Sequence, residues 1–250
     1  MVGTRMVLSV VYLGRVAYRA GLELQARLVE LRKAGAIGDV LVMLEHPPVL
    51  TLGRNAGRAN VLLSDDDLRA RGVELVDTNR GGDVTYHGPG QLVGYPIFDL
   101  RGPLRAAGKR LGPVDFVRQM EEALIRTMAD YGLAAMRVPG RTGVWTQPNG
   151  AVEEKKLAAI GIHVSAGVTS HGFALNVTTD LEDFGWIVPC GIDDRAATSL
   201  EMESRSADLT LPTAAERVAR QFGRVFNAQM LWLESLDELA PVNAEPQVQA

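Results

Sequence analysis

Two long, mostly apolar stretches separated by only two residues constrain the fold of this chain most strongly. Residues 156–165 and 168–177 are rich in apolar and β-branched residues, and Ala166-Gly167 lies between them. Stretches of this kind favour strands, and a two-residue connection joins antiparallel neighbours. The sequence therefore predicts a β-hairpin over 156–177.

Similar but shorter patterns predict most of the remaining elements. Apolar runs bounded by turn residues predict strands at 7–13, 40–44, 73–76, 92–98, 135–138 and 143–146. Apolar residues at helical spacing predict helices at 18–32 and 116–131. No internal repeat or linker indicates a domain boundary.

Capping patterns predict two more helices. Ser64 followed by three aspartates resembles an N-cap with an acidic first turn, and it opens a short helix that Gly72 ends. Thr213 and Glu216 form a capping-box pattern, which predicts a last helix that extends to Met230.

The composition is that of an ordinary soluble globular protein and argues against several functions. The chain of 250 residues is 46% hydrophobic and 22% charged, with a formal net charge of -4. Without a basic face it is not expected to bind nucleic acid, and no apolar run near its start is long enough to span a membrane. One cysteine and no signal-peptide pattern favour the cytoplasm. Aperiodic polar residues predict a frayed tail at 236–250.

Cys190 is the only cysteine, so it forms neither a disulfide within the chain nor a cysteine cage for a metal. It is either a small buried hydrophobic residue or a reactive thiol. Pro189 and Gly191 on either side indicate a turn where the backbone can approach a ligand, which favours the reactive thiol.

Residues 79–91 contain four glycines and a proline, and they are not expected to form a regular element. Arg80, Thr85, Tyr86, His87 and Gln91 add polar side chains to this loop. Glycines that allow close backbone approach, together with polar groups, favour a small-molecule pocket, although an ordinary glycine-rich hairpin has the same composition. The glycine spacing of a phosphate-binding loop is absent.

Lys156 opens the first strand of the predicted hairpin. Its ammonium group either reaches solvent, the commoner case, or is buried with a lowered pKa and can act as a base. The basic residues between 101 and 113 form a solvated loop or a docking site for an acidic partner. The four histidines match no zinc-binding spacing, so no metal site is expected.

Taken together, six motifs in this order resemble the octanoyltransferases of lipoate biosynthesis, over roughly residues 7–225. They are Glu45-His46-Pro47-Pro48-Val49, the loop from Arg80 to Gln91, Gly143-Val144-Trp145, Lys156-Leu157-Ala158-Ala159-Ile160-Gly161, His171-Gly172-Phe173-Ala174-Leu175-Asn176 and Pro189-Cys190-Gly191. The resemblance implies one α+β catalytic domain at 1–235. Its mixed, largely antiparallel sheet would be flanked by helices, as in biotin and lipoate protein ligases.

The resemblance also implies the site residues. Cys190 corresponds to the family's acyl-thioester nucleophile, and Lys156, not Lys155, corresponds to the lysine that activates it. The residues implied to line the acyl pocket are Arg80, Gly81, Gly82, Asp83, Val84, Thr85, Tyr86, His87, Ala159, Ile160, Gly161, Gly172, Phe173 and Ala174. Leu50 stands where many relatives carry an aromatic residue, which bears on chain-length preference.

The implied reaction moves an octanoyl group from octanoyl-acyl carrier protein to a lysine of a lipoyl domain, through a cysteine thioester and without ATP, cofactor or metal. The implied acceptors are lipoyl domains of 2-oxoacid dehydrogenase complexes and the glycine cleavage H protein. Neither nucleic acid nor a membrane is an expected partner. Two alternatives remain: an ATP-dependent lipoate or biotin ligase on the same fold, and a non-catalytic acyl-binding protein with an inert Cys190.

Overall fold

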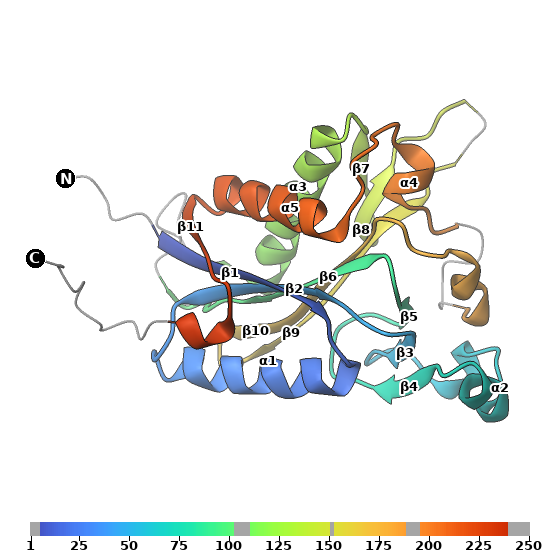
Figure 1. Cartoon of the computed structure of the whole chain (residues 1–250), viewed down its shortest axis with the longest axis horizontal. Helices are drawn as coiled ribbons and strands as arrows, with labels where there is room; N and C mark the ends of the chain where they lie inside the picture. The colour runs from blue at the N-terminus through green and yellow to red at the C-terminus, as the bar shows by residue number, and fades with distance from the viewer. Residues whose placement is uncertain (1–5, 103–110, 151–152, 189–195, 240–250) are drawn as a thin grey trace, which may run out of the picture.

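The computed structural model describes residues 6–102, 111–150, 153–188 and 196–239. Eight strands form one sheet in the order β11-β1-β2-β6-β10-β9-β8-β7, and three form a small sheet in the order β4-β3-β5 (Figure 1). In the large sheet β1 runs parallel to β2 and β11, and every other neighbouring pair is antiparallel. The expected mixed, largely antiparallel sheet is therefore confirmed.

The bounds of the elements agree with most of the sequence-based expectations. The large sheet contains β1 (Met6–Arg15), β2 (Asp39–Glu45), β6 (Gln91–Ile97), β7 (Ala135–Val138), β8 (Arg141–Thr146), β9 (Lys156–Ser165), β10 (Val168–Asn176) and β11 (Ala228–Trp232). The small sheet contains β3 (Val49–Leu52), β4 (Glu74–Asp77) and β5 (Val84–His87). The helices are α1 (Tyr18–Lys33), α2 (Asp65–Ala70), α3 (Pro113–Asp130), α4 (Leu200–Glu203) and α5 (Leu211–Val225). Single 3₁₀ turns lie at η1 (Arg58–Asn60), η2 (Glu182–Trp186) and η3 (Leu236–Glu238).

Helices cover both faces of the large sheet, with α1 on one side and α3 and α5 on the other (Figure 1). Strand β2 contributes apolar side chains to both faces of the sheet, because successive side chains of a strand point to opposite faces. Leu41 and Met43 belong to the core under α3 and α5, whereas Val40 and Val42 belong to the core under α1. No helix within the described ranges is long and apolar enough to cross a membrane.

The predicted hairpin is confirmed, and it brings Lys156 to one end of the large sheet. Strands β9 and β10 pair from Ser165 opposite Val168 to Ala158 opposite Leu175. Ala166 and Gly167 both have positive φ, at 48° and 84°, which is the conformation that a two-residue hairpin turn of the primed type requires.

The expectation that residues 79–91 contain no regular element is wrong. Strand β5 lies inside this range and pairs antiparallel with β3, with Thr85 opposite Thr51 and His87 opposite Val49. The glycines stand before and after the strand, and the four residues of the strand itself are β-branched, aromatic or His, a composition that suits a half-buried strand.

The C-terminal region differs from the expectation in three places. Helix α5 begins at Leu211, and its cap is Thr210, whose Oγ1 accepts a hydrogen bond from the Thr213 backbone N–H at 3.3 Å. Met230 lies in β11, a short edge strand, and not in the last helix. Residues 236–239, within the predicted tail, pack partly against the core through two leucines. Residues 240–250 lie outside the described ranges.

Candidate active site

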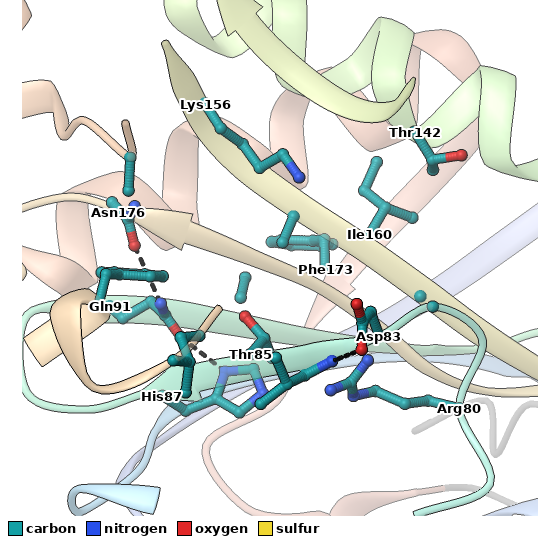
Figure 2. Close-up of a pocket in the computed structure, with 18 of the residues that line it drawn as sticks. Arg80, Asp83, Thr85, His87, Gln91, Thr142, Lys156, Ile160, Phe173 and Asn176 are labelled. Carbon is teal, nitrogen blue, oxygen red and sulfur yellow. Dashed lines mark hydrogen bonds between the residues drawn. The ribbon is translucent and has the colours of Figure 1, made fainter. Parts of the chain in front are cut away.

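A cavity of about 1140 Å³ lies between the small sheet and the β9–β10 hairpin (Figure 2). Its walls come from the loop before β5, from β5 itself, and from the middle of β9 and β10. Residues 140–142 and 181–188 close two further sides. The volume exceeds the roughly 300–1,000 Å³ of common small-molecule sites, so the cavity is large enough for a sizeable substrate.

The structure brings almost all of the predicted pocket residues to this cavity. The lining includes Arg80, Gly81, Gly82, Asp83, Val84, Thr85, His87, Ala159, Ile160, Gly161, Gly172, Phe173 and Ala174. Tyr86 is the exception. Its ring packs edge-on against Phe184 and Trp186, and its hydroxyl donates to Asp183 at 2.5 Å. Leu50, its partner across the strands, lies in the same small core and not in the cavity wall.

The backbone of the loop before β5 packs directly against the backbone of β9. The Gly81 N–H donates to the Ile162 carbonyl at 3.0 Å. A Cβ atom on Gly161 would stand 2.5 Å from the Gly81 carbonyl oxygen, so only glycine allows this approach. Arg80 is only 8% exposed, and its guanidinium donates to Thr51 through Nε and Nη2. Arg80 therefore ties the loop to β3.

Lys156 is the first residue of β9 and lines the cavity (Figure 2). Its Nζ lies 4.7 Å from the centre of the Trp145 ring, and no described carboxylate lies within ion-pair distance of it. Burial, and then the positive charge of Arg141, lower the pKa of Lys156 to about 8. The neighbouring Lys155 instead pairs with Glu203 at 3.6 Å. Lys156 is thus partly buried with a lowered pKa, which favours the second of the two alternatives considered from sequence.

Pro189, Cys190 and Gly191 lie outside the described residues. The residues on either side are described, and Val188, Ala196 and Ala197 all line the cavity. The Val188 N–H donates to the Asn60 carbonyl at 2.8 Å. The Lys156 N–H donates to the Ala196 carbonyl at 3.1 Å. The described residues on either side of 189–195 therefore lie at the cavity wall, and Ala196 is hydrogen-bonded to Lys156.

A chain of side-chain hydrogen bonds crosses the cavity floor (Figure 2). His87 Nδ1 lies 2.7 Å from Gln91 Oε1, Gln91 Nε2 donates to Asn176 Oδ1 at 2.9 Å, and Asn176 Nδ2 donates to the Thr198 carbonyl at 2.9 Å. Burial, and next the neighbouring His46, lower the pKa of His87 to about 3. His87 is therefore a neutral imidazole at physiological pH.

Two more histidines beside the cavity are kept neutral in the same way. His46 Nδ1 donates to the Val16 carbonyl at 2.6 Å, and its Nε2 accepts from the Tyr95 hydroxyl at 2.6 Å. His171 Nε2 lies 2.6 Å from Asn79 Oδ1. Burial lowers the pKa of both imidazoles to about 4. Within the described ranges, no three His, Cys, Asp or Glu side chains gather closely enough to hold a metal ion.

Sequence reasoning did not assign several residues of the cavity wall. The lining also includes Tyr18, Tyr95, Arg141 and Asn176, and it includes Gln91, which the sequence indicated only as a polar side chain of the 79–91 loop. Gln91 and Asn176 end two of the six motifs, so position in a motif was a usable signal for them. Tyr18 in α1 and Tyr95 in β6 carry no local signal, because only the packing of α1 and β6 beside the small sheet brings them to the site.

Known proteins resemble this chain over nearly its whole length. Residues 17–223 match the family described as the Lipoyl protein ligase A/B catalytic domain. A relative named octanoyltransferase from Acidobacterium capsulatum is 63% identical over 238 residues, covering 94% of this chain and 97% of the relative. Another octanoyltransferase, from Koribacter versatilis, is 52% identical and covers 94% and 90%.

Solved structures support the same fold. A bipartite lipoate protein ligase from Thermoplasma acidophilum superposes with a TM-score of 0.68 at 18% identity, covering 92% of this chain and 87% of that one. A lipoate-protein ligase A bound with ATP superposes with a TM-score of 0.69 at 15% identity, covering 92% and 89%. At such identities the likeness is one of fold alone. The relatives and the matched domain confirm the resemblance drawn from the six motifs, and the chain belongs to the octanoyltransferase family of enzymes.

Proposed function

We propose that this enzyme takes an octanoyl group from octanoyl-acyl carrier protein onto Cys190 as a thioester and passes it to a lysine of a lipoyl domain. The observation that carries the proposal is the position of Lys156. Its amine has a pKa lowered to about 8, its side chain lines the cavity, and its backbone N–H donates to the carbonyl of Ala196, six positions after Cys190 in the chain.

The position of Cys190 in the chain supports its role. Cys190 follows Val188, a cavity-lining residue, by two positions, and two residues span at most about 7 Å. Chain connectivity is therefore compatible with a thiol that reaches the cavity that Lys156 lines.

Activation of the thiol is the first chemical requirement. A cysteine is mostly protonated at neutral pH, and only the thiolate attacks a thioester. With a pKa of about 8, roughly 10% of Lys156 is neutral at pH 7, against about 0.03% for an ordinary lysine. The neutral amine can accept the thiol proton, and the resulting ammonium stabilises the thiolate.

The first half of the reaction then exchanges one thioester for another. The Cys190 thiolate attacks the octanoyl carbonyl, a new C–S bond forms, and the C–S bond to the carrier's pantetheine breaks. The ammonium of Lys156 returns its proton to the departing thiolate. The bond types broken and formed are the same, so this half is close to neutral in free energy.

In the second half the ε-amine of the acceptor lysine attacks the thioester on Cys190. A C–N bond forms, the C–S bond breaks, and the amine proton must pass to a base. Lys156, with its pKa of about 8, is the better candidate base, and His87, whose pKa of about 3 disfavours the protonated ring, lies on the opposite side of the cavity (Figure 2). An amide is more stable than a thioester, so this half is downhill and requires no ATP.

The cavity wall supports an acyl substrate. Ile160, Phe173 and Ala174 line it from β9 and β10. Each methylene buried against such a wall contributes roughly 0.8 kcal/mol, so an eight-carbon chain is favoured over short ones. We further propose a cytoplasmic site of action. The proposed acceptors are the lipoyl domains of 2-oxoacid dehydrogenase complexes and the glycine cleavage H protein.

A transfer assay with two donors tests the proposal. The enzyme is mixed with a purified lipoyl domain and either octanoyl-acyl carrier protein without ATP, or free octanoate with ATP. We expect the lipoyl domain to gain one octanoyl group only from the carrier protein, measured by mass spectrometry. Acylation that requires octanoate and ATP would identify a ligase, and acylation by neither donor would support the non-catalytic alternative.

A further inference from the structure

Gln91 and Asn176 form a hydrogen-bonded chain that has only one consistent proton arrangement. A main-chain carbonyl only accepts hydrogen bonds, so the Thr198 carbonyl requires the amide nitrogen of Asn176 to face it. Asn176 Oδ1 then faces Gln91 and requires the amide nitrogen of Gln91. The Tyr86 carbonyl, 3.2 Å from the same Gln91 nitrogen, requires the same orientation.

This arrangement determines which nitrogen of His87 carries the proton. Gln91 presents its oxygen to His87 Nδ1 at 2.7 Å, and an oxygen acceptor requires a proton on Nδ1. In a neutral imidazole the other nitrogen, Nε2, is then an acceptor. Nε2 has no hydrogen-bond partner within the described part of the chain, and His87 lines the cavity.

The surroundings keep the ring neutral and oriented. The Tyr18 ring stacks on His87 with ring centres 5.9 Å apart, and the His46 ring meets its edge at 6.1 Å. Coulombic interactions with Arg80 and His171 also disfavour a positive charge on the imidazole. No described carboxylate is among the groups that shift its titration.

We propose that Gln91 and Asn176 are positioning residues. They hold His87 as the Nδ1–H tautomer, so that the neutral Nε2 is free to accept a hydrogen bond from the attacking lysine amine and orient it in the second half of the reaction. This inference rests on the proposed function and assigns the group that positions the acceptor amine, while Lys156 takes its proton. The anchoring residue Thr198 also donates its N–H to the Lys156 carbonyl at 2.9 Å, so the same segment supports both residues.

The tautomer can be measured without substrate. The chain has four histidines, so ¹⁵N-histidine labelling gives a two-dimensional long-range ¹H–¹⁵N spectrum in which each ring is assigned by substitution. We expect the wild-type signals that disappear in His87→Gln to be those of the Nδ1–H tautomer at pH 7. An Nε2–H pattern at His87 would overturn the proposal.

Removing the acceptor gives the second test. In Gln91→Met, which keeps the side-chain length, His87 should lose its single tautomer. Transfer from Cys190 to the lipoyl domain should slow by about 10- to 100-fold, the size of effect that follows when a reacting group is misplaced by about 1 Å. Formation of the thioester should stay within about twofold of wild type, since it uses Lys156. Asn176→Leu removes the anchor and should act in the same direction, which provides the test if Gln91→Met does not fold.

Gln221→Met is the matched control, because Gln221 is a buried glutamine of α5 outside the cavity, bonded to Asp130. It should leave both half-reactions and the His87 spectrum unchanged. An unchanged His87 tautomer in Gln91→Met, or equal slowing of both half-reactions, would assign Gln91 a purely structural role. Failure of wild type to form any thioester would instead remove the proposed function, whatever the spectrum shows.

Discussion

Replacing Lys156 by methionine should stabilise the fold at neutral pH while removing activity. Methionine has a similar length and no charge, and it can occupy the site against the Trp145 ring without a buried ammonium group. Active sites commonly carry such a conflict between stability and function.

The magnitude follows from the lowered pKa. The pKa of Lys156 falls from 10.5 to about 8, and 2.5 units at 1.36 kcal/mol each correspond to about 3.4 kcal/mol. Below pH 8 the lysine is charged in the folded and unfolded states, so folding bears this whole cost. The lost contact of the ammonium with Trp145 offsets about 0.5–2 kcal/mol. The methionine variant should therefore gain about 1–3 kcal/mol at pH 7.

The pH dependence of the free energy of unfolding tests the same reasoning. Between pH 8 and 10.5 the unfolded lysine still holds its proton and the folded one does not, so wild-type stability rises with pH. The difference between Lys156→Met and wild type should therefore shrink across this window. Urea denaturation at pH 7, 8, 9 and 10 measures it. Lys155→Met, which removes a half-exposed ion pair, is the control and should change stability by less than about 1 kcal/mol. No gain at pH 7, or a difference that does not change with pH, would refute the reasoning.

Two more predictions concern the cavity. The three histidines kept neutral beside it have folded pKa values below the unfolded value of 6.5. Below pH 6.5 the unfolded state therefore binds protons that the folded state does not, and the free energy of unfolding decreases as pH falls toward 4. Urea denaturation should show a loss of about 2 kcal/mol per histidine between pH 6.5 and 5, and a flat profile would contradict it. Gly161→Ala should push the Gly81 carbonyl away, costing about 1–3 kcal/mol and slowing acyl transfer, while Gly38→Ala, in open space, should do neither. Equal behaviour of the two variants in denaturation and transfer assays would show that the close approach is unimportant.

The hairpin β9–β10 could be predicted from sequence because its information is local. A two-residue turn and two long apolar strands leave one arrangement, and the structure has it. Strand β5 was missed because glycines on both sides dominate the composition of its segment, although Val84 to His87 alone reads as a strand. Alternation along that strand also explains why Tyr86 faces the small core while His87 reaches the cavity.

The polar chain behind His87 could not be predicted in the same way. Gln91, Asn176 and Thr198 come from two strands and a loop that meet only in the folded sheet. Likewise, the choice between a solvated and a buried Lys156 depends on Trp145 and Arg141, which belong to the neighbouring strand β8. The sequence motifs identify His87 and Lys156 as candidate site residues, but their protonation states depend on the packing of the strands.

The central claim is the octanoyl thioester on Cys190, and intact-mass spectrometry tests it most directly. The protein is mixed with octanoyl-acyl carrier protein, without ATP or acceptor, beside Cys190→Ser. The account predicts a mass increase of one octanoyl group on wild type only, removed by hydroxylamine. An unmodified wild type that still octanoylates lipoyl domains, or a variant that transfers at the wild-type rate, would contradict it.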